Sequence, residues 1–90
     1  MNSKNERILD IIMNTEKYNK AFIETLGVNE EQLKSLEYQS IREWDSVGHM
    51  SLVAAIEESF DIMLDTDDII DFNSYEKGKK ILVKYNVEFD

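Results

Sequence analysis

Residues 43–60 read EWDSVGHMSLVAAIEESF and have the pattern of one complete helix. Ser46 is a residue type that commonly begins a helix, and the pattern continues to about Ser59 or Phe60. At about 100° per residue, apolar side chains gather on one side of this helix: Leu52, Val53, Ile56 and Phe60. Such a stripe is typical of a helix that packs against a core.

A second stripe lies on the opposite side of the same helix. Its members are first apolar and then acidic: Val47, Met50, Ala54, Glu57, Glu58 and Asp61. Two interpretations stay open, a central helix packed on both sides or an exposed docking surface for a partner that places a hydrophobic pocket beside Lys or Arg. We favour docking, because three carboxylates are costly to bury.

The charge of the chain is concentrated in and after this helix. Residues 43–76 hold ten of the 19 acidic residues and no Lys or Arg, whereas the rest of the chain has nine acidic and ten basic residues. This segment therefore produces the formal net charge of −9. A surface of that sign repels phosphates, so we expect basic partner proteins and no nucleic acid.

The length and composition favour one helical domain over residues 1–90. The chain has no Pro and no Cys, and 90 residues form a modest core with little room for a catalytic cleft, so we do not expect an enzyme. The longest mostly apolar run, residues 50–56, is far shorter than the roughly 20 residues of a membrane span. The N-terminus lacks a signal-peptide pattern, and we expect a cytoplasmic protein.

Upstream of Ser46, the apolar periodicity predicts a helix that ends at Gly27. Gly27 suits the left-handed conformation that terminates helices. The apolar stripe on one side of this helix is Ile8, Ile12, Tyr18, Phe22 and Leu26. Asn14 and Thr15 interrupt the stripe, which leaves either one long helix or a second helix that begins there. Residues 28–45 have an irregular pattern and predict a long loop with room for one helical turn.

Downstream of Phe60, two shorter helices are predicted. Thr66 is a candidate cap for a helix that ends near Asp71, and two acids follow it in the first turn. Asn73 or Ser74 can cap a last helix. No segment alternates apolar and polar residues between turn signals, so an all-α fold is expected.

Ser46 has both an ordinary structural role and a chemical one open to it. Serine at a helix start is usually a cap, but Asp45 can take that role and leave the hydroxyl free. A hydrolytic serine would need a base, for which His49 is the only candidate, and no Gly-x-Ser-x-Gly elbow surrounds the serine. A phosphodiester attached to Ser46 would lie in the favourable field of the helix N-terminus.

Asp45-Ser46-Val47 resembles the Asp-Ser-Leu signature of the acyl carrier protein family. Residues 52–62 are similar to the recognition helix of that family and the turn after it, and Leu26-Gly27-Val28 resembles the end of its first helix. The likeness covers about residues 14–85. It implies an acyl-carrier-like four-helix bundle with a long loop between helices 1 and 2 and a short third helix, and residues 1–13 would form an N-terminal extension.

The resemblance implies covalent carriage. A phosphopantetheinyl transferase would transfer 4′-phosphopantetheine from coenzyme A to Ser46, and the arm would carry acyl or aminoacyl groups as thioesters. The implied partners are this transferase and acyl-loading and acyl-transferring enzymes with basic docking surfaces, and the carrier would be a cytoplasmic monomer. Positions matched to docking contacts are Asp45, Val47, Met50, Ala54, Glu57 and Glu58, to which the outer stripe adds Asp61.

Several residues depart from the family pattern. Ser51 stands where fatty-acid carriers typically have an acid, and Trp44 and Gly48-His49-Met50 are more similar to stand-alone carriers of specialised biosynthetic pathways. Trp44 can equally be a packing anchor, and Gly48 can allow close approach of the arm or a partner. A cavity for the carried chain, if one forms, would lie among Phe22, Leu52, Ile56, Phe60, Phe72 and Leu82. The alternative function is a non-covalent, acidic helical interaction module without a prosthetic group.

Overall fold

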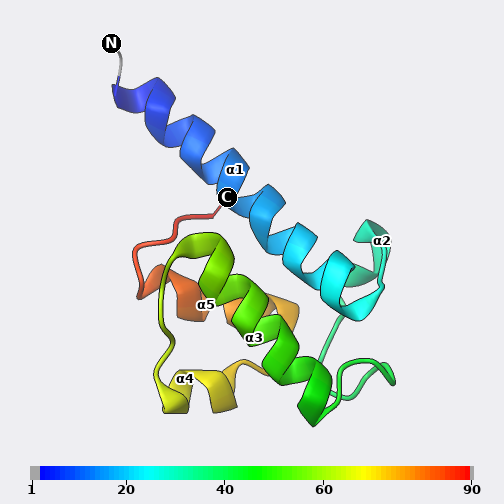
Figure 1. The fold of residues 1–90 in the computed structure, drawn as a ribbon. Helices are drawn as coiled ribbons and strands as arrows, with labels where there is room; N and C mark the ends of the chain where they lie inside the picture. Colours follow the sequence, from blue (N-terminus) through cyan, green and yellow to red (C-terminus); the bar gives the residue numbers. More distant parts are fainter. Residues whose placement is uncertain (1–2, 90) are drawn as a thin grey trace.

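Helices and loops make up residues 3–89, the part of the chain that the computed structural model describes (Figure 1). The only β-type pairing within this part is an isolated bridge between Glu37 and Ser74, so the all-α prediction is confirmed. The long loop before Ser46 contains one short helix, as its pattern allowed. The helices are α1 (Ser3–Leu26), α2 (Glu30–Leu33), α3 (Ser46–Phe60), α4 (Thr66–Asp71) and α5 (Tyr75–Val83).

The first helix is continuous through Asn14 and Thr15. The Thr15 hydroxyl donates to the Ile11 carbonyl at 3.1 Å, and the Asn14 amide donates to the Glu88 carbonyl at 3.0 Å, so neither side chain caps a new helix. The helix ends at Gly27, which has a φ of 69° and lies in the left-handed region, as predicted.

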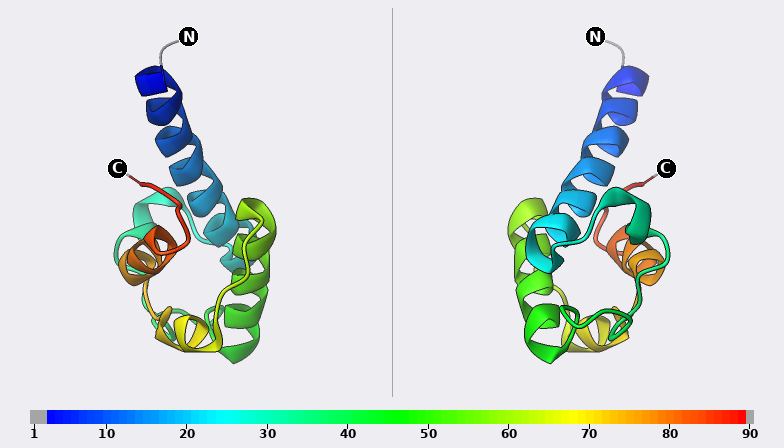
Figure 2. Two further views of the ribbon diagram at one scale, coloured as in Figure 1. Left: turned by 90° about the vertical axis from the view of Figure 1, so that its left-hand side faces the viewer. Right: turned by 90° about the vertical axis from the view of Figure 1, so that its right-hand side faces the viewer.

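The N-terminal half of α1 projects beyond the other helices (Figures 1 and 2). Ile8 and Ile12 continue the apolar stripe of α1, but the two residues are 49% and 46% exposed and do not belong to the core. Leu9 and Met13 are exposed beside them. Apolar periodicity identifies the face of a helix, but it does not show how far along the helix a partner covers that face.

The core between the helices is rich in aromatic rings. Phe22 of α1 lies edge-on to Trp44 with ring centroids 5.5 Å apart, and Tyr18 lies 5.0 Å from Tyr75 of α5. From α3 come Leu52, Val53 and Ile56, all buried, whereas Phe60 is only half-buried. The core stripe predicted for α3 is therefore confirmed for its first three members.

Helix α4 begins differently from the prediction. Thr66 is the first helical residue and not the cap; the N-cap is Asp65, whose side chain makes no capping hydrogen bond. The last helix begins as predicted, because the Ser74 hydroxyl accepts from the Lys77 N–H at 2.9 Å.

A buried carboxylate joins α4 to the end of α5. Asp68 is 7% exposed, and its two oxygens accept hydrogen bonds from the Lys84 ammonium and the Tyr85 hydroxyl, each at 2.5 Å. The Tyr85 hydroxyl also accepts from the Asp65 N–H at 2.9 Å. The hydrogen bond from Lys84, followed by that from Tyr85, holds the pKa of Asp68 below its ordinary value, and the same bond raises the pKa of Lys84.

Asp68→Asn is expected to lower the free energy of unfolding at neutral pH and to weaken the decrease of that free energy as the pH falls. Because the pKa of Asp68 is depressed below 3.8 in the folded state, its carboxylate stabilises the fold above that pH, and the contribution is lost as the pH falls through the folded value. Urea unfolding followed by circular dichroism across the acid range measures this. Asp67→Asn, at the exposed neighbour, should keep the parent's pH dependence. Identical acid slopes for Asp68→Asn and the parent would contradict the assignment.

Candidate functional site

At the start of α3, the helix is capped by Asp45 and not by the Ser46 hydroxyl. Asp45 is the N-cap: its Oδ1 accepts from the Gly48 N–H at 2.8 Å, and its carbonyl accepts from the His49 N–H at 2.8 Å. Ser46 is exposed, and no group that the structure describes forms a hydrogen bond with its hydroxyl. The hydroxyl is therefore available to another molecule.

Gly48 lets the loop before α3 approach the first turn of that helix. A Cβ at this position would lie 2.0 Å from the carbonyl oxygen of Glu43 and 3.4 Å from Oδ1 of Asp45. The group that comes close to Gly48 is therefore the chain's own backbone, and not the arm or a partner that the sequence suggested. Gly48 thus sets the position of residues 43–45 relative to Ser46.

Trp44 and His49 connect this loop to α3 and α4. Trp44 is fully buried, and its indole N–H donates to Nδ1 of His49 at 3.0 Å. Nε2 of His49 lies 2.8 Å from the Ile69 carbonyl. Since an indole nitrogen only donates, Nδ1 must accept, and the hydrogen-bond network assigns the ring proton to Nε2, which donates to Ile69.

These contacts decide two questions that the sequence left open, the role of Trp44 and whether His49 can act as a base. Trp44 is a packing anchor. His49 has both ring nitrogens engaged within the fold, so it is not placed to act as a base for Ser46. No local sequence pattern predicts the contact between His49 and Ile69, because the two residues are 20 positions apart.

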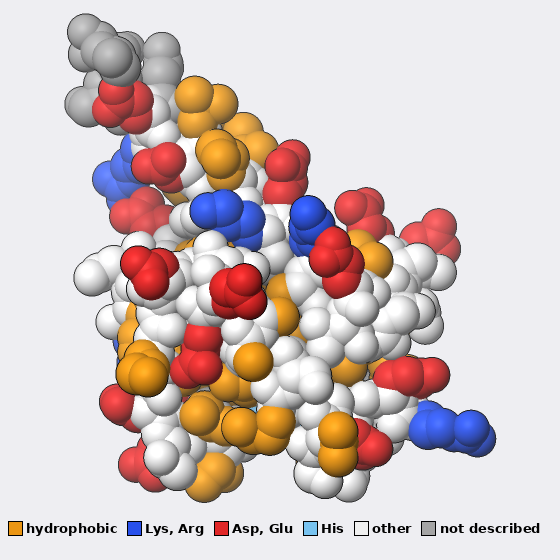
Figure 3. All heavy atoms as spheres, in the orientation of Figure 1, with side chains coloured by type: hydrophobic (Ala, Val, Ile, Leu, Met, Phe, Trp, Pro, Cys, Tyr) orange, Lys and Arg blue, Asp and Glu red, His pale blue; other side chains and the backbone are white. Residues whose placement is uncertain are grey.

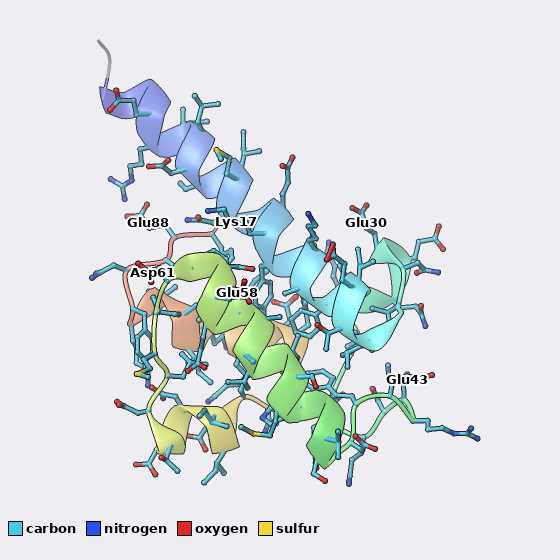
Figure 4. All side chains as sticks on the ribbon, in the orientation of Figure 1. Lys17, Glu30, Glu43, Glu58, Asp61 and Glu88 are labelled. Carbon is cyan, nitrogen blue, oxygen red and sulfur yellow. The ribbon has the colours of Figure 1, made fainter. Side chains whose placement is uncertain are left out.

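The outer face of α3 is open to solvent. Val47 is 75% exposed and Met50 is 54% exposed, so the interpretation of a helix packed on both sides is wrong. Ala54, Glu58 and Asp61 are exposed as well. Hydrophobic side chains gather over α4 and the N-terminal half of α3 in the lower part of Figure 3. Figure 4 places Glu58 and Asp61 towards the opposite end of α3, and the face therefore has an apolar end and an acidic end.

Glu57 differs from the other members of this face. It is only half-exposed, and its Oε2 accepts from the Leu64 N–H at 2.9 Å, which holds the turn after α3. In the same turn Asp61 adopts a left-handed conformation with a φ of 52° and ends the helix. The structure thus gives Glu57 a folding role that the sequence analysis did not predict, whereas Glu58 points its charge outward (Figure 4).

The described residues contain neither a cluster suited to a metal ion nor a membrane-spanning helix. No group of three or more acidic or histidine side chains within residues 3–89 is placed to hold a metal ion. None of the helices described is long and apolar enough to cross a membrane. The chain matches no protein-family model, no curated protein and no solved structure.

Proposed function

We propose that this chain is an acyl carrier protein of a specialised biosynthetic pathway. Its Ser46 hydroxyl accepts 4′-phosphopantetheine from coenzyme A. The observation that most supports the proposal is the Asp45 cap, which leaves an exposed and unengaged hydroxyl at the head of a 15-residue helix. The Asp-Ser-Val sequence at this hydroxyl is similar to the family signature.

The residues around Ser46 suit an attached phosphodiester. The positive end of the α3 dipole lies beside the hydroxyl and favours negative charge. The Asp45 carboxylate accepts from the Gly48 N–H, while no group in the described part of the chain accepts from the N–H groups of Ser46 and Val47. These two donors are close to the position that a phosphate on Ser46 would occupy.

The attachment reaction balances with coenzyme A as the donor. The Ser46 oxygen bonds to the phosphorus that carries the pantetheine, the bond from that phosphorus to the bridging oxygen breaks, and adenosine 3′,5′-bisphosphate leaves. A base on the transferase must take the hydroxyl proton, because His49 is engaged with Trp44 and Ile69. When bound, the arm supplies a thiol for thioester formation, which a chain without cysteine does not itself possess.

The exposed face of α3 supports recognition by basic partner enzymes in the cytoplasm. Its apolar residues, Val47, Met50 and Ala54, offer a contact patch, and the acidic residues Glu58 and Asp61 lie at its other end. The net charge of −9 steers approach to cationic surfaces. Ser51, exposed on the same helix, stands where fatty-acid carriers typically have an acid. The proposed partners are therefore the transferase and the loading and transferring enzymes of another pathway.

The proposal predicts a gain of one phosphopantetheinyl group when the chain is incubated with coenzyme A and a broad-specificity transferase. Intact-protein mass spectrometry measures the gain. Ser46→Ala should show none, whereas Ser51→Ala, at an exposed serine in the same helix, should gain the group as the parent does. If the parent shows no gain, or if Ser46→Ala gains the same mass, the carrier assignment is wrong. An unmodified chain that still binds basic proteins would instead support the non-covalent interaction module.

A further inference from the structure

The interior beside Ser46 is filled by the chain's own rings. Phe22 and Phe72, two residues that would line a cavity for a carried chain, are buried with ring centroids 6.2 Å apart. The His49 ring lies 6.1 Å from Phe72, and the Trp44 ring lies 5.5 Å from Phe22. Rings at these separations are in contact, so the positions in which a chain could lie are already occupied.

Hydrogen bonds close the seam between α3 and α4 near both of its ends. Near Ser46, Nε2 of His49 donates to the Ile69 carbonyl at 2.8 Å. At the other end, the Glu57 carboxylate accepts from the Leu64 N–H at 2.9 Å. A chain entering between the two helices would have to break at least the first bond, leaving the Ile69 carbonyl without its partner and the Trp44 indole without a fixed acceptor.

Helix α4 is also fixed on its other side. Asp68 accepts from Lys84 and from Tyr85, and the Tyr85 hydroxyl accepts from the Asp65 N–H at 2.9 Å. Moving α4 outward would separate the buried carboxylate of Asp68 from both partners. The helix that would have to move to admit a chain is therefore tied to α3 and to the end of α5.

We infer that this protein holds its cargo outside the helical bundle and that the cargo is a short acyl or polar aminoacyl group. The inference rests on the proposed carrier function. A long alkyl chain on the arm would remain in water because the interior offers it no space, and exposing such a chain is unfavourable. A short or polar group carries little of this penalty, and it stays accessible to the enzymes that load and remove it.

The test compares acetyl and octanoyl forms, made by the same transferase from acetyl- and octanoyl-coenzyme A. Cleavage of each thioester by hydroxylamine is followed by intact mass, and each rate is divided by that of the matching free acyl-pantetheine to remove intrinsic reactivity. The two normalised rates should agree within about twofold, whereas enclosure of the octanoyl group would slow its cleavage about tenfold or more. Trp44 is the only tryptophan and lies beside the occupied interior, so its fluorescence should not differ between the two forms.

The outcomes distinguish this inference from the function on which it rests. Failure of both acyl-coenzyme A compounds to add mass at Ser46 would overturn the carrier assignment. Successful loading followed by a protected octanoyl thioester, or by a shift of Trp44 emission only in the octanoyl form, would overturn the inference about cargo and leave the carrier assignment intact. Equal normalised rates with unchanged emission support both.

Discussion

Gly78→Ala is expected to lower the free energy of unfolding by about 3 kcal/mol, near the upper end of the usual range for overpacking a core. Helix propensity alone predicts the opposite sign, because alanine is favoured over glycine by about 1 kcal/mol inside a helix. Gly78 is buried in α5, and a Cβ there would lie 2.2 Å from the Tyr18 hydroxyl and 2.3 Å from Cζ of Phe72. Both rings are enclosed by the core and have no free space into which to move.

Thermal unfolding followed by circular dichroism should show a melting temperature about 12–24 °C lower for Gly78→Ala. Lys80→Ala, at an exposed position of the same helix, should change stability by no more than about 0.5 kcal/mol. Adding Tyr18→Phe removes one of the three atoms that would clash with the new Cβ. The double variant should therefore be more stable, by at least about 0.5 kcal/mol, than the sum of the two single effects predicts. An unchanged or higher melting temperature for Gly78→Ala would show that α5 does not pack as closely as described.

Gly48→Ala should lower the free energy of unfolding by about 2 kcal/mol and slow the proposed phosphopantetheinyl transfer to Ser46 about tenfold or more. The added Cβ would lie 2.0 Å from the Glu43 carbonyl oxygen, so the loop must retreat from α3. Trp44, next along the chain, is buried and bonded to His49, and it resists that movement. The strain therefore falls on Asp45 and on the geometry around Ser46. Urea unfolding and the initial rate of mass gain measure the two effects.

Gly27→Ala is a suitable control for this second experiment. Gly27 has a φ of 69°, and a Cβ there meets no atom within 4 Å, so its substitution costs backbone strain of about 1–2 kcal/mol without a clash. It lies at the end of α1 and not at the start of α3, and Gly27→Ala should be modified at the parent's rate. If Gly48→Ala has the parent's stability, or if both variants are modified equally slowly, the role assigned to Gly48 is wrong.

Features that depend on neighbours within a few residues could be predicted from the sequence. Asp45 caps an N–H three residues ahead, and Ser74 does the same for Lys77. Gly27 ends α1 through its own backbone conformation. The start of α3 and the free Ser46 hydroxyl could be predicted because local chain geometry determines both.

Features that depend on residues far apart in sequence could not be predicted in this way. Asp68 is one of two acids that follow Thr66 in a first helical turn, and this local pattern does not show that it is buried against Lys84, 16 residues later. The space around Gly78 is set by Tyr18, which comes from another helix. Ile8 and Ile12 continue the periodicity of the core stripe, but α1 extends past the helices that would cover them. Local sequence patterns do not show which distant residues will contact a side chain or how far a neighbouring helix extends.

The separation of the helix cap from the Ser46 hydroxyl has a consequence for how enzymes would distinguish the states of the proposed carrier. Because Asp45 holds the first turn of α3, esterifying Ser46 removes no bond that keeps the helix folded. With its interior also occupied, the bundle would present the same shape whether the arm is absent, empty or loaded. In the proposed pathway, each enzyme would then have to recognise its substrate by the chemical group at the end of the arm, since the protein surface itself would not change.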